Sequence, residues 1–208
     1  MELFDLLLQE PVIIILLIFL MAFLIQMVYY IGVYARVLFY KLAPEPRDLP
    51  PVSVIICARN EETNLEKNLP TVLEQDYPEY EVIVVNDGSS DDSDMVITRL
   101  QQKYQHLQAT EIKNDQKFTH GKKLAVTLGI KKAKYDWVLF TDADCYPAGK
   151  NWIRSIAKNF NDKTSIVLGY GGYKARRGLL NTLIRYDTLT IALQYFTYAL
   201  GGFPYMGV

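Results

Sequence analysis

The strongest restriction on how this chain folds is an alternation between short aliphatic runs and longer segments with helical spacing. Residues 52–58, 81–85 and 137–141 are apolar at nearly every position, which predicts strands buried on both faces. The remaining expected elements are helices at 64–75, 91–103, 122–133 and 152–160, and strands at 108–112 and 165–169. Strands that alternate with helices predict an α/β fold with a parallel-type sheet covered on both faces.

An uncharged segment precedes this pattern. Residues 11–35 contain no charged side chain, and as a helix they would extend roughly 37 Å, enough to cross a hydrocarbon core of about 30 Å. A cleaved signal peptide would have basic residues before the run and small residues after it. Here acidic residues precede it, and Tyr29, Tyr30 and Tyr34 follow its most aliphatic part, residues 12–24, as in an interfacial aromatic belt. We therefore expect residues 1–42 to form a retained transmembrane anchor.

The flanks of the run predict its orientation. Arg36, Lys41 and Arg47 follow it, and no Lys or Arg precedes it. The positive-inside bias then places the rest of a single-pass protein of the cell (inner) membrane in the cytoplasm. The two cysteines, Cys57 and Cys145, are too few for a disulfide framework, which agrees with a reducing compartment.

The prolines and the overall composition predict the domain organisation and exclude some classes of protein. Four prolines in residues 43–51 predict an extended linker, so a globular domain is expected over residues 52–208. The formal charge of −1 argues against a nucleic-acid partner bound through bulk positive charge. With 50% hydrophobic and 22% charged residues, disorder is not expected.

Polar segments begin where the three strongest strands end. They are residues 57–62, 86–93 and 142–144. In parallel α/β sheets ligands bind outside the carboxyl ends of the strands. Asp87 stands there ahead of a glycine turn, so we expect it to contact a ligand. Four other polar residues are expected only to stabilise helix starts: Glu62, Ser90, Asp91 and Asp92.

Asp142 and Asp144 form an Asp-x-Asp pattern at the end of the buried strand predicted at 137–141. Asp92 and Asp94 share the spacing without such a strand, and we attribute that pair to chance. Two carboxylates at a strand mouth repel each other unless a positive charge lies between them. In extended chain both side chains point to one side, so they could hold a divalent cation together with diphosphate oxygens.

Four segments together resemble the family 2 glycosyltransferases. They are residues 52–62 (VSVIICARNEE), 81–91 (EVIVVNDGSSD), 120–125 (HGKKLA) and 136–144 (DWVLFTDAD), in the family's order. The resemblance covers residues 51–172. It implies a GT-A fold with a mixed, mostly parallel sheet, a nucleotide-diphospho-sugar donor, and a divalent metal, Mg²⁺ or Mn²⁺.

The resemblance also implies roles for individual residues. Ala58, Arg59, Asn60 and Glu61 would line the nucleoside pocket, and Asp87 would hydrogen-bond the base. Lys122 matches a basic residue near the nucleotide. Asp142 would approach the ribose or the metal, and Asp144 would ligate the metal. A cation and a lysine suit the chemistry independently, because the leaving diphosphate gains negative charge as the glycosidic bond breaks.

One departure from the family concerns the general base, a carboxylate expected on the acceptor side. After Asp144 the only acidic residues are Asp162 and Asp187, and neither has the expected setting. We therefore expect a truncated chain whose acceptor half and general base lie beyond Val208. The apolar run 179–203 is interpreted as a core-facing helix, with an interfacial helix against the membrane as the alternative.

The function expected from the resemblance is sugar transfer at the cytoplasmic face of a membrane, to a cell-surface polysaccharide or a lipid-linked glycan. A membrane-tethered nucleotide-sugar-binding protein without catalysis is one alternative. A nucleotidyltransferase is a weaker one, because residues 58–61 lack the glycine-rich basic loop that would cradle a triphosphate.

Overall fold

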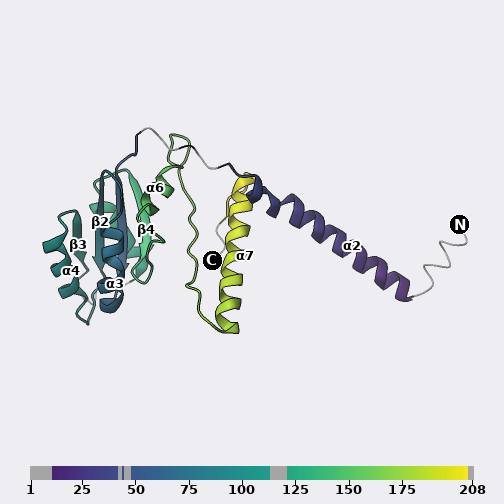
Figure 1. The fold of residues 1–208 in the computed structure, drawn as a ribbon, viewed down its shortest axis with the longest axis horizontal. Coiled ribbons are helices and arrows are strands. Elements are labelled where there is room, and N and C mark those ends of the chain that lie inside the picture. The colour runs from purple at the N-terminus through teal and green to yellow at the C-terminus, as the bar shows by residue number, and fades with distance from the viewer. Residues whose placement is uncertain (1–10, 42–43, 45–47, 113–120, 206–208) are drawn as a thin grey trace, which may run out of the picture. The chain divides into compact units, whose positions relative to one another are not determined.

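The computed structural model describes residues 11–41, 44, 48–112 and 121–205 (Figure 1). Arg47, Val208 and much of the linker predicted at 43–51 lie outside these ranges. The chain divides into two compact units. One is Ala43–Val167, and the other combines Met1–Leu42 with Leu168–Val208.

The unit Ala43–Val167 is built on a four-stranded sheet. Its strands are β1 (Val52–Ala58), β2 (Tyr80–Asn86), β3 (Leu107–Glu111) and β4 (Trp137–Asp142). They lie in the order β3-β2-β1-β4, and every pairing is parallel. The predicted α/β fold is therefore confirmed, although the sheet formed by the described residues is wholly parallel rather than mixed.

Helices cover both faces of this sheet because side chains alternate along β1 and β2. One face packs against α3 (Glu62–Leu73), α4 (Ser93–Lys103) and α6 (Trp152–Ala157). The other face, with Ile55, Ile83 and Val85, packs against α5 (Lys122–Lys132). Both central strands are buried on each side, as their unbroken aliphatic runs predict.

Two strand predictions need correction. The strand predicted as buried at 137–141 forms, but β4 lies at the sheet edge and is only half-buried, with Phe140 49% exposed. Ser165–Gly169 forms no strand. A β-strand needs a neighbour to accept and donate its backbone hydrogen bonds, and this segment pairs with none of the described strands, while Ile166 lies exposed.

A buried carboxylate ties the amino ends of the strands together. Glu81 on β2 accepts hydrogen bonds from Ser53 Oγ (2.6 Å), Gln108 Nε2 (2.8 Å) and the Lys134 amide (2.7 Å). Ser53 Oγ in turn accepts from the Tyr135 amide (3.2 Å). Partners of this kind are what allow a carboxylate to be buried, and they fix the chain leading into β4.

The other unit contains α2 (Pro11–Gly32), η1 (Tyr34–Phe39) and α7 (Leu179–Leu200). By length and composition Pro11–Phe39 could cross a membrane, with a mean hydropathy of 2.9 over its most apolar window. Within this unit the hydroxyls of Tyr29 and Tyr198 lie 2.9 Å apart.

Helix α7 covers most of the apolar run predicted at 179–203, but within the described residues it is not a core-facing helix. Only Ala192 and Thr197 are buried, whereas Leu179, Leu180 and Tyr186 are each more than two-thirds exposed. The interpretation of α7 as a core helix is therefore corrected. Its apolar residues surround the helix rather than forming a single stripe, so they identify no particular buried face.

Candidate functional site

The three polar segments singled out in the sequence meet at the carboxyl edge of the sheet, where its parallel strands end. Strand β1 lies between β2 and β4, with Ala58 paired to Asn86 and Cys57 paired to Asp142. The chain winds from β1 to β2 and β3 on one side, and β4 then returns on the other side of β1. The carboxyl end of β1 is thus the point where the winding reverses, which is where open α/β sheets bind ligands.

Asp87 lies on the β2 side of this edge. It is 5% exposed, and its amide donates to the carbonyl of Ala58 (2.8 Å). The following Gly88 has a φ of 60°, a left-handed conformation that favours glycine and turns the chain away from the strand. The predicted strand-end position of Asp87 before a glycine turn is therefore present, and its carboxylate is held close to β1.

The half-buried thiol of Cys57 marks the middle of the site. Burial raises its pKa, the positive charge of Lys122 opposes this, and the carboxylates of Asp142 and Asp87 reinforce it. The thiol at the end of β1 therefore lies within electrostatic reach of Lys122, Asp142 and Asp87. The sequence gives no signal for this position of Cys57, because its neighbours in the strand are apolar.

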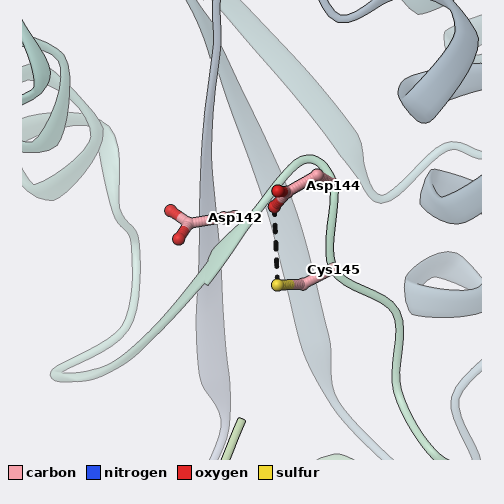
Figure 2. Close-up of side chains that lie close together, drawn as sticks. All are labelled: Asp142, Asp144 and Cys145. Atoms are coloured by element: carbon pink, nitrogen blue, oxygen red, sulfur yellow. Dashed lines mark hydrogen bonds between the residues drawn. The ribbon is translucent and has the colours of Figure 1, made fainter. Parts of the chain in front are cut away.

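The acidic pair lies with Cys145 in a cluster whose possible ligand atoms are all within 4.8 Å of one another (Figure 2). Strand β4 ends at Asp142, and the Cys145 amide donates to the Asp142 carbonyl (3.1 Å). The expected extended geometry is therefore corrected. A turn, rather than the alternation of a strand, brings Asp144 back towards Asp142.

The carboxylates of Asp142 and Asp144 are exposed, and their oxygens suit a hard cation such as Mg²⁺ or Mn²⁺. The thiol of Cys145 fits such an ion less well. Burial raises its pKa, and the nearby Asp144 carboxylate, which accepts a hydrogen bond from Sγ (3.5 Å), raises it further (Figure 2). A thiol is a soft ligand, whereas Mg²⁺ and Mn²⁺ prefer oxygen, so the two aspartates are the fitting ligands.

A hydrogen bond from α3 supports the turn that contains Asp144. Asn68 is buried in that helix, and its Nδ2 donates to the Ala143 carbonyl (3.0 Å). The Ala143 side chain is buried as well. Sequence reasoning missed Asn68. The available signal was a polar residue adjacent to Leu69 in the apolar spacing of the helix.

Lys122 begins α5 and faces the acidic cluster. Its Nζ lies 2.7 Å from Asp142 Oδ1, and this hydrogen bond raises the pKa of Lys122, with partial burial opposing the shift. Both side chains are largely exposed. Such pairs contribute about 0–1 kcal/mol to stability, so the ammonium group can leave Asp142 for a more highly charged partner at little cost.

The loop after β1 contributes mainly backbone and polar groups. Arg59 and Asn60 are exposed and Glu61 is half-buried, with its Oε2 accepting from Asn64 Nδ2 (2.6 Å). Ala58 as a whole is only 2% exposed, because its side chain belongs to the core and its carbonyl accepts the hydrogen bond of the Asp87 amide.

Comparison with known proteins gives a consistent result. The family model described as glycosyl transferase family 2 matches residues 53–198. Over 100 residues the chain is 32% identical to poly-beta-1,6-N-acetyl-D-glucosamine synthase of Staphylococcus epidermidis, which covers 48% of this chain and 23% of that protein. The synthase of the same name from Staphylococcus aureus (strain COL) is 30% identical over 115 residues, covering 53% and 27%. The matched stretch thus spans about a quarter of the length of these relatives.

A solved structure is also similar. The mannosyltransferase from Pyrobaculum calidifontis, determined in complex with GDP-Man and Mn²⁺, superposes with a TM-score of 0.58 at 26% sequence identity. The superposition covers 80% of this chain and 46% of that one.

Proposed function

This chain belongs to glycosyl transferase family 2, and from that membership we propose that it transfers a sugar from a nucleotide-diphospho-sugar donor to a glycan acceptor. The observation that carries the proposal is that the carboxyl ends of β1, β2 and β4 lie together at the carboxyl edge of the sheet. Asp87, Lys122 and the Asp142–Asp144 pair come from three separate chain segments and surround the end of β1. A nucleotide, a diphosphate and a cation need complementary groups of these kinds.

Each group has a distinct task in this proposal. The buried carboxylate of Asp87 accepts a hydrogen bond from the base, beside the loop of residues 58–61. Asp142 and Asp144 ligate a divalent cation, and Asp142 also lies near the ribose. The cation supplies charge neutralisation to the diphosphate leaving group when bound. The Mn²⁺ in the similar mannosyltransferase supports this assignment.

Lys122 stabilises the leaving group from the other side. Without a donor its ammonium group pairs with Asp142 at 2.7 Å. A diphosphate carries more negative charge than one carboxylate, so we expect Lys122 to contact the phosphates when the donor binds. Charge placed in advance where negative charge develops is an effective source of transition-state stabilisation.

The acceptor and the location also belong to the proposal. The names of the Staphylococcus relatives describe synthases of a sugar polymer, which supports a polysaccharide as acceptor. A lipid-linked glycan is the alternative acceptor in this proposal. We propose that the apolar helix Pro11–Phe39 anchors the protein in the inner membrane. The basic residues Arg36 and Lys41 that follow its apolar part support a cytoplasmic position for the sheet.

Calorimetric titration of the detergent-solubilised chain with UDP and GDP tests the donor site. We expect binding of one nucleotide in Mg²⁺ or Mn²⁺ and its loss in chelator. Asp144→Ala should weaken binding at least about tenfold, equivalent to about 1.4 kcal/mol. Asp94→Ala is the matched control, because Asp94 is an exposed aspartate on α4 that belongs to a similar Asp-x-Asp pattern, and we expect it to bind normally.

The outcomes separate the parts of the proposal. Nucleotide binding that is unchanged by chelator would contradict the metal assignment. The absence of binding by both nucleotides would contradict the donor site. Sugar transfer to a glycan, assayed with UDP-N-acetylglucosamine and GDP-mannose, would favour a transferase over a nucleotide-sugar-binding protein without catalysis.

A further inference from the structure

The loop after β1 and the loop after β2 are joined by side chains that accept hydrogen bonds from backbone amides. The three successive amides of residues 60–62 each donate to a side-chain oxygen of the segment 89–93. The bonds are Asn60 N to Ser89 Oγ (2.9 Å), Glu61 N to Ser93 Oγ (3.0 Å) and Glu62 N to Asp91 Oδ2 (3.1 Å). Both loops leave neighbouring parallel strands, so these bonds hold the two sides of the nucleoside site to each other.

The side chain of Asn60 also accepts hydrogen bonds from the loop after β2. Its Oδ1 accepts from the amide (2.8 Å) and the hydroxyl (3.2 Å) of Ser90. Asn60 has a φ of 56°, and it is the one described non-glycine residue with a positive φ. Asparagine tolerates this left-handed conformation better than most residues. The cross-loop bonds therefore hold an unusual backbone conformation directly before Glu61.

The carboxylate of Asp91 accepts one hydrogen bond from each of the two loops. Its Oδ2 accepts from the Glu62 amide, and its Oδ1 accepts from the Ser93 amide (3.1 Å). Although desolvation acts in the opposite direction, hydrogen bonds from Ser93 and Glu62 lower the pKa of Asp91, so it remains a carboxylate with two acceptor oxygens. As expected, Asp91 stabilises a helix start, and it does so at two helices, because its oxygens accept from the first residues of α3 and α4.

Ser93 is the most informative member of this group because it is fully buried, with 0% of its surface exposed. A ligand at the carboxyl edge of the sheet cannot reach its hydroxyl. Any effect of Ser93 on donor binding must therefore act through the groups it touches, and its contact in the other loop is the Glu61 amide.

We propose that Ser93, together with Asp91 and Asn60, is a positioning residue that locks the two loops into one preformed nucleoside pocket. The inference rests on the proposed function, since it assumes that a nucleoside binds between these loops. Its physical basis is preorganisation: a loop that is already ordered pays less conformational entropy when the ligand binds. The pocket should therefore exist before the donor arrives.

The hydrogen bonds between the two loops also limit where the diphosphate can bind. A free helix start would offer its amides to phosphate oxygens. The amides of residues 60–62, at the start of α3, already donate to serine and aspartate oxygens. The diphosphate is thereby directed to the other side of β1, where Lys122 and the Asp142–Asp144 pair lie.

The test compares two buried serines in the full chain. Ser93→Ala removes the acceptor of the Glu61 amide, and we expect the affinity for nucleoside diphosphate to fall about tenfold, as for one lost buried hydrogen bond. The donor KM should rise much more than kcat falls. Ser93→Thr, which keeps the hydroxyl, should restore most of the affinity.

Ser53→Ala is the matched control. Ser53 is also 0% exposed and loses two hydrogen bonds on substitution, but it lies at the amino end of β1, away from the site. We expect it to lower the thermal midpoint while leaving the nucleotide affinity of the folded protein unchanged. Hydrogen exchange at the amides of residues 60–62 should accelerate in Ser93→Ala and not in Ser53→Ala.

Asn60→Gly supplies a second pair if Ser93→Ala does not fold. Glycine keeps the left-handed backbone but removes the acceptor of Ser90, so affinity should fall, whereas Asn60→Asp keeps an acceptor oxygen and should bind more tightly than Asn60→Gly. Unchanged affinity and unchanged exchange in Ser93→Ala would overturn the proposal, as would equal losses in Ser93→Ala and Ser53→Ala. A wild-type chain that binds no nucleoside diphosphate would instead overturn the proposed function, and that result needs no variant.

Discussion

At the scale of residues, Asp87 and Asp92 share one short loop but have opposite surroundings. Asp87 is buried at the end of β2, and its amide is bonded to the neighbouring strand. Asp92 is exposed at the start of α4 and makes no side-chain capping hydrogen bond there. The sequence separates these carboxylates by the strand-end position of Asp87, and the structure adds that only Asp87 is buried beside β1.

Replacing each aspartate separates a ligand contact from a surface charge. We expect Asp87→Ala to weaken nucleoside diphosphate binding by about 1.5–3 kcal/mol, the range for hydrogen bonds to charged groups. Asp92→Ala should bind like the wild-type chain. Titration calorimetry measures both, and equal losses in the two variants would count against Asp87 as a base contact.

At the scale of elements, the packing of α5 on the sheet positions Lys122. Gly129 lies where this helix approaches β1, and a Cβ atom there would come within 2.5 Å of Ile55 Cγ2. The stiff, β-branched Ile55 is fully buried in the sheet, so it has little freedom to move aside. The absence of a side chain at residue 129 thus sets how closely the helix that begins with Lys122 lies on the sheet.

Gly129→Ala should therefore destabilise the protein even though alanine favours helices. Overpacking costs about 1–3 kcal/mol, against a gain in helix propensity of at most about 1 kcal/mol. The midpoint of chemical or thermal unfolding, followed by circular dichroism, reports the difference. Gly149→Ala is the control, because no atom lies within 4 Å of its added Cβ. A Gly129→Ala protein as stable as the control would show that α5 can shift without cost.

At the scale of the whole molecule, the chain combines two dissimilar units. The sheet unit has strands and helices around two apolar clusters. The other unit holds the apolar helix Pro11–Phe39, none of whose most apolar window is buried within the protein. A surface of this kind needs an apolar environment such as a bilayer, which is the basis for the proposed anchor.

The proposed topology is tested by labelling a cysteine on the sheet unit. Lys103 lies at the end of α4 with its side chain 67% exposed, so Lys103→Cys in a Cys145→Ser background offers an accessible thiol. A membrane-impermeant maleimide should label it only after the cells are permeabilised. Strong labelling of intact cells would reverse the proposed orientation.

Elements whose signals are local could be predicted from the sequence. Unbroken aliphatic runs of strand length predict β1 and β2, because strands buried on both faces carry such runs, and the positions of Asp87 and Asp142 at strand ends follow from where those runs stop. The order of the motifs also identified the family. Helix boundaries were predicted to within a few residues, since apolar spacing defines the packed face more sharply than the ends.

Features that need a partner distant in the chain could be seen only in the folded protein. Ser165–Gly169 has strand-like residues but no neighbouring strand among the described residues, and β4 is half-buried because it lies at an edge of the sheet. Asn68 supports Ala143 across 75 residues, and Ser93 accepts from Glu61 across 32. A hydrogen bond between two loops leaves no periodic pattern in either one, because its geometry depends on strand order and register. The parallel pairing of β1 with β2 and β4 therefore turns four local motifs into one site.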